Sequence, residues 1–194
     1  EYTANWEEIQ YFTVFYNVHG HGTAPAEEKV ESGKTAAKPE NPTEDGWKFK
    51  GWYIRDNYIG EPFDFTTAIT RDTTLHAKWA RTWTVSFDVG SHGTAPTAQT
   101  VENGAKATKP ADPTAEDYSF QGWYTDTRYT MEYDFSKEVT EDTTVYAKWV
   151  KKPIVSFNKN GHGTAPASQT VELNGKAVKP ADPCLLYTSD AADD

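Results

Sequence analysis

The stretch Asp72-Thr73-Thr74-Leu75-His76-Ala77-Lys78-Trp79 returns as Asp142-Thr143-Thr144-Val145-Tyr146-Ala147-Lys148-Trp149. Other motifs recur in the same order, at offsets of 70 or 71 residues. They are His-Gly-Thr-Ala-Pro at 21–25, 92–96 and 162–166, Gly-Trp-Tyr at 51–53 and 122–124, and an aromatic-Asp-Phe motif at 63–65 and 133–135. A period near 70 exceeds the roughly 20–50 residues of solenoid units, so each repeat is predicted to be a small domain with its own core.

The repeats divide the 194 residues into predicted segments. Ala4-Asn5-Trp6 matches Ala77-Lys78-Trp79, so the chain is expected to begin in the last strand of an earlier repeat and to be a piece of a longer array. Its last eleven residues match nothing in the repeats, and we interpret them as read-through of a sequencing adapter. The segments are 1–9, the tail of a preceding repeat; 10–80 and 81–150, two complete modules; 151–183, a truncated module; and 184–194, the adapter-like stretch.

The composition excludes several classes of protein. The chain has 29 acidic and 19 basic residues and a formal net charge of −10, which argues against a nucleic-acid or anionic-membrane partner. No stretch approaches the roughly 18 apolar residues of a membrane span, so no membrane insertion is expected in this segment. The single cysteine, Cys184, excludes an internal disulfide and a cysteine-based zinc site. Aromatic residues make up 14 % of the chain, too many for a disordered one.

The second module predicts a mostly β fold, α+β at most, built of short strands. Alternating large and small residues predict strands, whereas the Pro-rich segment 109–113 predicts a connector. The residues between modules, 80–82 and 150–153, are expected to be short linkers that join independent domains. The predicted elements are strands at 84–87, 99–102 (followed by a tight turn at Asn103-Gly104), 118–124, 133–135 and 145–149, and one helical turn at 136–139 capped by Ser136.

Recurring aromatic residues are the candidates for the core. A small module without a disulfide needs large rings to bury enough apolar surface. The alternative is that the tryptophans form a flat exposed row that binds a glycan, and their exposure distinguishes the two. The predicted core aromatics are Trp52, Tyr53, Trp79, Trp123, Tyr124 and Trp149.

Polar motifs do not predict a catalytic or metal site. His19 and His21 are two residues apart, but Gly90 replaces His19 in the next module, and the recurring histidine supplies one ligand where a metal needs at least three. The carboxylates of 64 and 72, or of 134 and 142, could form an acid–base pair, but Asp is also typical of turns. We find no Gly-x-Ser-x-Gly elbow or phosphate loop. The chain is therefore predicted to be no enzyme and to need no cofactor or metal.

Five ordered segments resemble the Listeria–Bacteroides repeat family, known from the B repeats of internalin B. They are a Val-x-Phe strand (Val14-Phe15-Tyr16 in the first module), Lys-Pro-x-x-Pro, Gly-Trp-Tyr, Tyr/Phe-Asp-Phe and Asp-Thr-Thr-x-x-Ala-Lys-Trp, in this order in both modules. The resemblance implies compact β-grasp-like modules, similar to ubiquitin or SUMO, used as stalk or interaction repeats in secreted cell-envelope proteins. The His-Gly-Thr-Ala-Pro loop is longer than the family's usual Gly-Gly turn, which makes it the candidate interaction loop. Its candidate residues are His21, Thr23, His92, Thr94, His162 and Thr164.

The sequence and the resemblance together predict a non-catalytic repeat segment of a secreted or surface-anchored bacterial protein. It would act as a stalk or spacer and as a weak protein-interaction module, whose contacts multivalency strengthens. Host or cell-wall surface components or neighbouring repeats are the expected partners, and an anchor and signal peptide are expected outside this fragment. The alternative is an adhesin or carbohydrate-binding module that uses exposed aromatics or the His-Gly-Thr-Ala-Pro loop. The Lys-Pro-x-x-Pro segments could mimic ligands of SH3-like domains, but a rigid connector explains them too.

Overall fold

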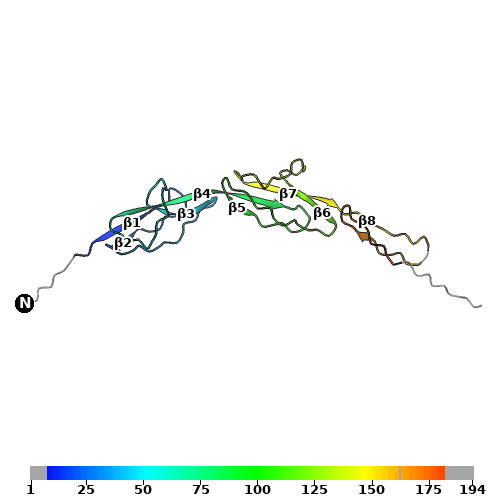
Figure 1. Ribbon diagram of the computed structural model, residues 1–194, viewed down its shortest axis with the longest axis horizontal. Coiled ribbons are helices and arrows are strands. Elements are labelled where there is room, and N and C mark those ends of the chain that lie inside the picture. The colour runs from blue at the N-terminus through cyan, green and yellow to red at the C-terminus, as the bar shows by residue number, and fades with distance from the viewer. Residues whose placement is uncertain (1–7, 162, 182–194) are drawn as a thin grey trace, which may run out of the picture. The chain divides into compact units, whose positions relative to one another are not determined.

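The computed structural model describes residues 8–161 and 163–181 (Figure 1). All its regular elements are strands, and no helix occurs within the described residues. The mostly β prediction is therefore confirmed, while the β-grasp topology stays a prediction. The predictions for residues 1–7, His162 and 182–194 lie outside the described residues. The strands are β1 Tyr11–Asn17, β2 Glu28–Glu31, β3 Trp47–Tyr53, β4 Thr73–Asp88, β5 Gln99–Glu102, β6 Tyr118–Tyr124, β7 Thr143–Lys151, β8 Ile154–Val155 and β9 Gln169–Thr170.

The chain divides into two compact units, and the division falls inside β4. The first unit comprises residues up to Val85 together with 99–107 and 136–143. The second comprises 86–98, 108–135 and the residues from Thr144 onward. The second sequence repeat therefore contributes to both units.

In the first unit, β1 pairs antiparallel with β2 and parallel with β4, and β3 pairs antiparallel with β4. Successive side chains of a strand point to opposite faces. Leu75 and Ala77 of β4 are accordingly fully buried, and they pack with Val14 of β1 and Trp52 of β3 in one core cluster. In the second unit, β6 pairs antiparallel with β7, and Val145 and Trp123 occupy the corresponding buried positions.

A β-bulge explains the glycine of each Gly-Trp-Tyr motif. The register of β3 shifts between Phe49 and Gly51, where Gly51 has a φ of +130°, and Gly122 in β6 has a φ of +136°. Phe49 and Trp52 would face opposite sides of a regular strand, because they are three residues apart. The extra residue of the bulge turns both rings to the same core, where they pack edge to face with centroids 5.3 Å apart. Glycine is needed here because residues that carry a Cβ rarely adopt a positive φ.

The prediction of a linker at residues 80–82 is wrong. These residues lie in the middle of β4, which Figure 1 shows as one uninterrupted strand. Thr82 is only 6 % exposed, and its backbone N–H donates to the carbonyl of Gly46 at 2.8 Å. The predicted strand 84–87 is the continuation of the same element. Of the second predicted linker, residues 150 and 151 belong to β7, and only 152 and 153 follow it.

The other predicted elements had mixed outcomes. The strands 99–102, 118–124 and 145–149 are confirmed as β5, β6 and part of β7, and the turn after β5 contains Gly104 at a φ of +80°. The strand 133–135 is wrong, because the segment makes single backbone bonds instead of a ladder: Tyr133 N–H donates to the Trp123 carbonyl at 2.7 Å. The helical turn 136–139 is also wrong. Val139 instead exchanges backbone hydrogen bonds with Gly104 and Ala105.

Candidate functional site

The His-Gly-Thr-Ala-Pro loop of the first repeat folds back onto the body of its unit. The His21 ring lies against Trp47, with centroids 4.1 Å apart, and meets the edge of Trp79 at 5.9 Å. Gly22 has a φ of +65°, and a Cβ there would lie 2.7 Å from the Thr43 carbonyl oxygen. The loop therefore needs glycine both for its backbone conformation and for close packing.

The second repeat has the same arrangement. The His92 ring stacks on Tyr118 at 3.8 Å and meets the edge of Trp149 at 5.9 Å. A Cβ on Gly93 would lie 2.6 Å from the carbonyl oxygen of Thr114. In both repeats the closing tryptophan donates its indole N–H to the backbone carbonyl that starts the loop, 3.1 Å from Trp79 Nε1 to Val18 O and from Trp149 Nε1 to Val89 O. In these two repeats the histidine of the loop is thus a packing residue.

The candidate loop presents threonines to solvent. Thr23 and Thr94 are exposed, and so is Thr164 in the third copy, while His21 and His92 are half-buried. A threonine hydroxyl can both donate and accept a hydrogen bond. The loop therefore offers hydroxyl groups at its surface, held in place by the buried side of the same loop.

Sequence reasoning missed the contact between His19 and His76. The His19 Nε2 lies 3.0 Å from His76 Nδ1, and the rings stack with centroids 5.1 Å apart. His19 was weighed with His21, yet the two contact different rings. One signal could have found the pair: both histidines are absent from the second repeat, where Gly90 and Tyr146 replace them. Within the described residues, no group of three or more His, Cys, Asp or Glu side chains could hold a metal ion.

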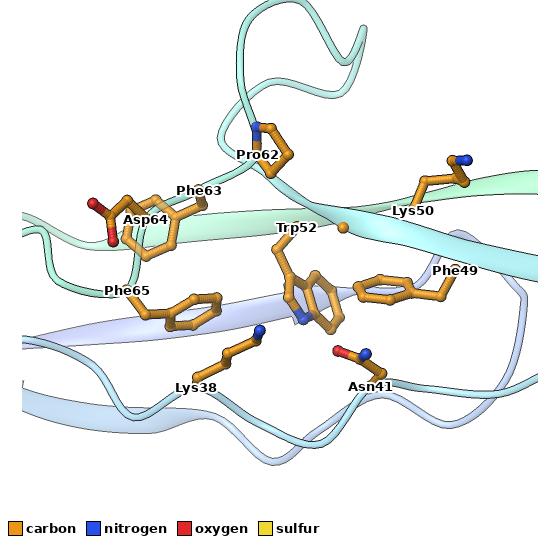
Figure 2. A pocket seen from close by; sticks show the side chains of 10 residues that line it. Lys38, Asn41, Phe49, Lys50, Trp52, Pro62, Phe63, Asp64 and Phe65 are labelled. Carbon is orange, nitrogen blue, oxygen red and sulfur yellow. The ribbon is translucent and has the colours of Figure 1, made fainter.

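A cavity of about 430 Å³ lies beside Trp52 in the first unit (Figure 2). Figure 2 shows the indole nitrogen of Trp52 turned toward Lys38 and Asn41, with the Phe49 and Phe65 rings beside it. Trp52 is 2 % exposed, and its Nε1 has no hydrogen-bond partner within the described residues. The lining of the cavity therefore combines aromatic rings with two lysines, an amide and a carboxylate. Its lining residues are Lys38, Asn41, Phe49, Lys50, Gly51, Trp52, Pro62, Phe63, Asp64 and Phe65.

The carboxylate that lines this cavity is already hydrogen-bonded within a turn. Asp64 accepts hydrogen bonds from the backbone N–H of Thr66 at 2.9 Å and from its hydroxyl at 2.8 Å. These two bonds, the backbone one first, hold the pKa of Asp64 below its ordinary value. A carboxylate with a lowered pKa is a poor general base at neutral pH.

The aspartates that open the Asp-Thr-Thr motifs connect strands. Asp72 accepts from the backbone N–H of Thr13 at 2.8 Å, and Asp142 accepts from that of Thr84 at 2.7 Å. Each bond joins the start of a repeat to its end. Asp72 and Asp142 thus each bind a backbone N–H group, which is a structural use.

The predicted core aromatics lie at different depths. Trp52 and Trp123 are 2 % and 1 % exposed, and Tyr53 is buried. Tyr124 is half-buried, as are Trp79 and Trp149. Trp123 packs edge to face against Phe87 and Phe120, with centroids 5.1 and 5.3 Å apart. The two most deeply buried tryptophans cannot present a ring face to a glycan.

Comparison with known proteins gives matches to one family and to longer proteins. The model of the Listeria-Bacteroides repeat domain matches residues 12–78 and 83–148. A membrane protein of Evansella cellulosilytica is 36 % identical over 184 residues, covering 93 % of this chain and 27 % of the relative. A Gly-rich membrane protein of the same organism is 34 % identical over 184 residues, covering 93 % of this chain and 21 % of the relative.

A third relative is Internalin H of Listeria monocytogenes, which is 28 % identical over 169 residues, covering 84 % of this chain and 28 % of the relative. The chain thus spans about a quarter of the length of the curated relatives that it matches. Among the described residues of this chain, no helix is both long and apolar enough to cross a membrane.

Proposed function

The chain belongs to the Listeria-Bacteroides repeat family, and from this premise we propose that it is a non-catalytic repeat segment of a secreted or cell-envelope bacterial protein. The repeats act as a spacer and as a weak protein-interaction module. Their partners are host or cell-wall surface components or neighbouring repeats. The surface location is supported by relatives named as membrane proteins and as an internalin.

The main observation that supports the spacer role is that β4 continues from the first repeat into the second. This strand of 16 residues contains the end of the first matched repeat and the start of the second. Backbone hydrogen bonds of a paired strand hold its residues in extended conformation, at about 3.3 Å per residue. β4 thus joins the first two repeats without a separate linker segment, which suits a spacer built of tandem repeats.

The non-catalytic role is supported by how the polar groups are used. The carboxylates of Asp64, Asp72 and Asp142 accept hydrogen bonds from nearby backbone N–H groups. The recurring histidines His21 and His92 pack against aromatic rings. General acid–base chemistry needs such groups to be placed together and aimed at a substrate.

A carbohydrate-binding or adhesive role is the second candidate, and the loop threonines favour it. Thr23 and Thr94 are exposed on loops whose buried sides have the same geometry in both repeats. Since Trp52 and Trp123 are buried, the ligand contacts in this role come from the loop. A glycan screen with the double variant T23A/T94A tests it: loss of binding in a folded variant supports this second role.

The spacer role is tested in the full-length protein on its own cell. The segment 12–148 is replaced by an unrelated folded spacer of equal length, and the function of the intact protein is compared with that of a plain deletion. We expect the deletion to impair function and the unrelated spacer to restore it. Failure of the spacer to restore function would show that the repeats supply a specific contact.

A further inference from the structure

One acidic position recurs in every copy of the repeat. A Val-Glu pair ends the second strand region at 30–31, 101–102 and 171–172. Val30 and Val101 are buried in the cores of their sheets. The glutamates Glu31, Glu102 and Glu172 therefore occupy equivalent places, and what each one contacts can be compared.

Glu102 contacts the preceding repeat. Its carboxylate lies 2.9 Å from Lys48 Nζ and 3.0 Å from Lys50 Nζ, both on β3. The pairing of the strands explains the contact: Lys48 is opposite Ala80 of β4, and Glu102 is opposite Thr82. Residues two apart share a face of a strand, so the lysine and glutamate meet on one face above β4. All of these residues belong to the first unit.

Glu172 makes one corresponding contact with the preceding repeat, in the second unit: its carboxylate accepts a hydrogen bond from the Ser119 hydroxyl at 3.4 Å. The same carboxylate also lies 2.6 Å from Lys152 Nζ, which belongs to its own repeat. Ser119 occupies the place of Lys48 in its repeat. The contact across the junction thus recurs, with a serine hydroxyl in place of a lysine ammonium.

A backbone hydrogen bond recurs beside each ion pair. The Thr82 N–H donates to the Gly46 carbonyl at 2.8 Å, and the Lys152 N–H donates to the Asp117 carbonyl at 2.8 Å. Thr82 and Lys152 are equivalent residues, as are Gly46 and Asp117. Each junction between repeats therefore combines a carboxylate contact with one main-chain bond.

Burial at this position differs among the three copies. Thr82 is 6 % exposed and the side chain of Lys152 is 15 % exposed, and each follows a described repeat. Tyr11 is the equivalent residue of the first repeat, and it is 56 % exposed. A tyrosine offers more apolar area than a threonine, so its exposure leaves a large surface that a neighbour can cover.

Arg81 strengthens the first junction. Its guanidinium lies 5.5 Å from the ring centre of Trp47, in the first repeat, and 4.5 Å from that of Trp83, in the second. Trp83 is held in turn by the hydrogen bond from its Nε1 to Asn103 Oδ1 at 2.8 Å. A guanidinium between two aromatic faces is attracted to both.

We propose that the surface of Tyr11 and Glu31 is a docking surface for another copy of the repeat, located before residue 8 of the chain, and that each such junction couples the folding of adjacent repeats. The preceding copy supplies a main-chain carbonyl, like that of Gly46, and a donor side chain at the place of Lys48. The sequence is consistent with this occupant, since Ala4-Asn5-Trp6 matches the end of a repeat. This coupling goes beyond the spacer role and holds whether or not the array acts as a spacer.

The first test compares E102Q with the matched variant E31Q in the full chain. Amide hydrogen exchange of β3 reports on the first repeat, although residue 102 belongs to the second. We expect E102Q to speed exchange in β3 by about 1.5- to 5-fold, as suits a partly exposed ion-pair network. E31Q should leave exchange unchanged, because its partner repeat is not in this chain. Equal effects of the two variants, or no effect of E102Q, would overturn the proposal.

The second test adds the missing occupant. A copy of residues 10–81 replaces residues 1–10, so that Tyr11 follows the tryptophan of the added repeat by three positions, as Thr82 follows Trp79. We expect the Tyr11 amide to become protected and E31Q to acquire the effect of E102Q. Docking at this surface is contradicted if the Tyr11 amide exchanges as fast as before.

Discussion

Replacing Trp123 with alanine tests the largest single contribution to the core. The ring is 1 % exposed, and it packs edge to face against Phe87 and Phe120. A buried Trp→Ala change costs about 3–5 kcal/mol, because it removes apolar contacts and leaves a cavity. The indole N–H that is lost has no hydrogen-bond partner within the described residues. Removing an unsatisfied buried donor raises the free energy of unfolding by about 1–3 kcal/mol. We therefore expect a net loss of about 2 kcal/mol, below the usual range.

The assay is urea unfolding at pH 7, followed by far-ultraviolet circular dichroism, with the slope checked against the parent protein. Met131→Ala is the control, because Met131 is 61 % exposed and exposed substitutions usually stay within about 0.5 kcal/mol. Trp123→Phe keeps a ring and removes the unpaired N–H, so it should cost less than W123A. A W123A variant as stable as M131A would refute the view that this ring holds the core together. So would a W123A variant that folds normally but has lost binding to a glycan.

Two further predictions concern the junction and the loop. The hydrogen bonds from Lys48 and then Lys50 hold the pKa of Glu102 below its ordinary value of 4.5. A group with a lowered folded-state pKa stabilises the protein above its unfolded pKa and loses this effect as pH falls. The parent protein should therefore lose stability relative to E102Q below about pH 4.5 in urea titrations, and parallel pH profiles would contradict this. In the loop, G93A should cost more than G90A: both glycines have positive φ, but only the Gly93 methyl would lie 2.6 Å from the Thr114 oxygen. Left-handed backbone alone costs about 1–2 kcal/mol, so equal thermal unfolding of the two variants would show that the loop is not packed as described.

The local pattern of large and small side chains predicted those strands that pair regularly with a neighbouring strand. The large rings set among small or polar residues in 118–124 predict β6 with its observed bounds. The bulge at Gly122, which brings both Phe120 and Trp123 to the core, is not part of that alternation. The same alternation at 133–135 misled, since a strand also needs a neighbour for its hydrogen bonds, and this segment bonds at single points. Periodicity describes side chains and carries no information about where the backbone finds partners.

The failed linker has the same cause. Residues 80–82 lie between two sequence motifs, which is where a linker is expected in a chain of separate domains. The residues contain no Gly or Pro that would end a strand, and the partners that extend β4 come from residues far away in sequence, such as Gly46. The His19–His76 contact was missed for a similar reason, because 57 residues separate the two rings. Sequence periodicity found the repeats, but it did not reveal how they are joined.

Hydrogen exchange of the amides at 80–83 tests the central claim most directly, namely that the first two repeats are joined by a shared strand instead of a linker. The measurement is made on the full chain, with the exposed loop 55–60 as the internal reference. The account predicts that the Thr82 amide, bonded to Gly46 at 2.8 Å, exchanges as slowly as the amides of β3. Exchange at 80–83 as fast as in the reference loop would contradict it.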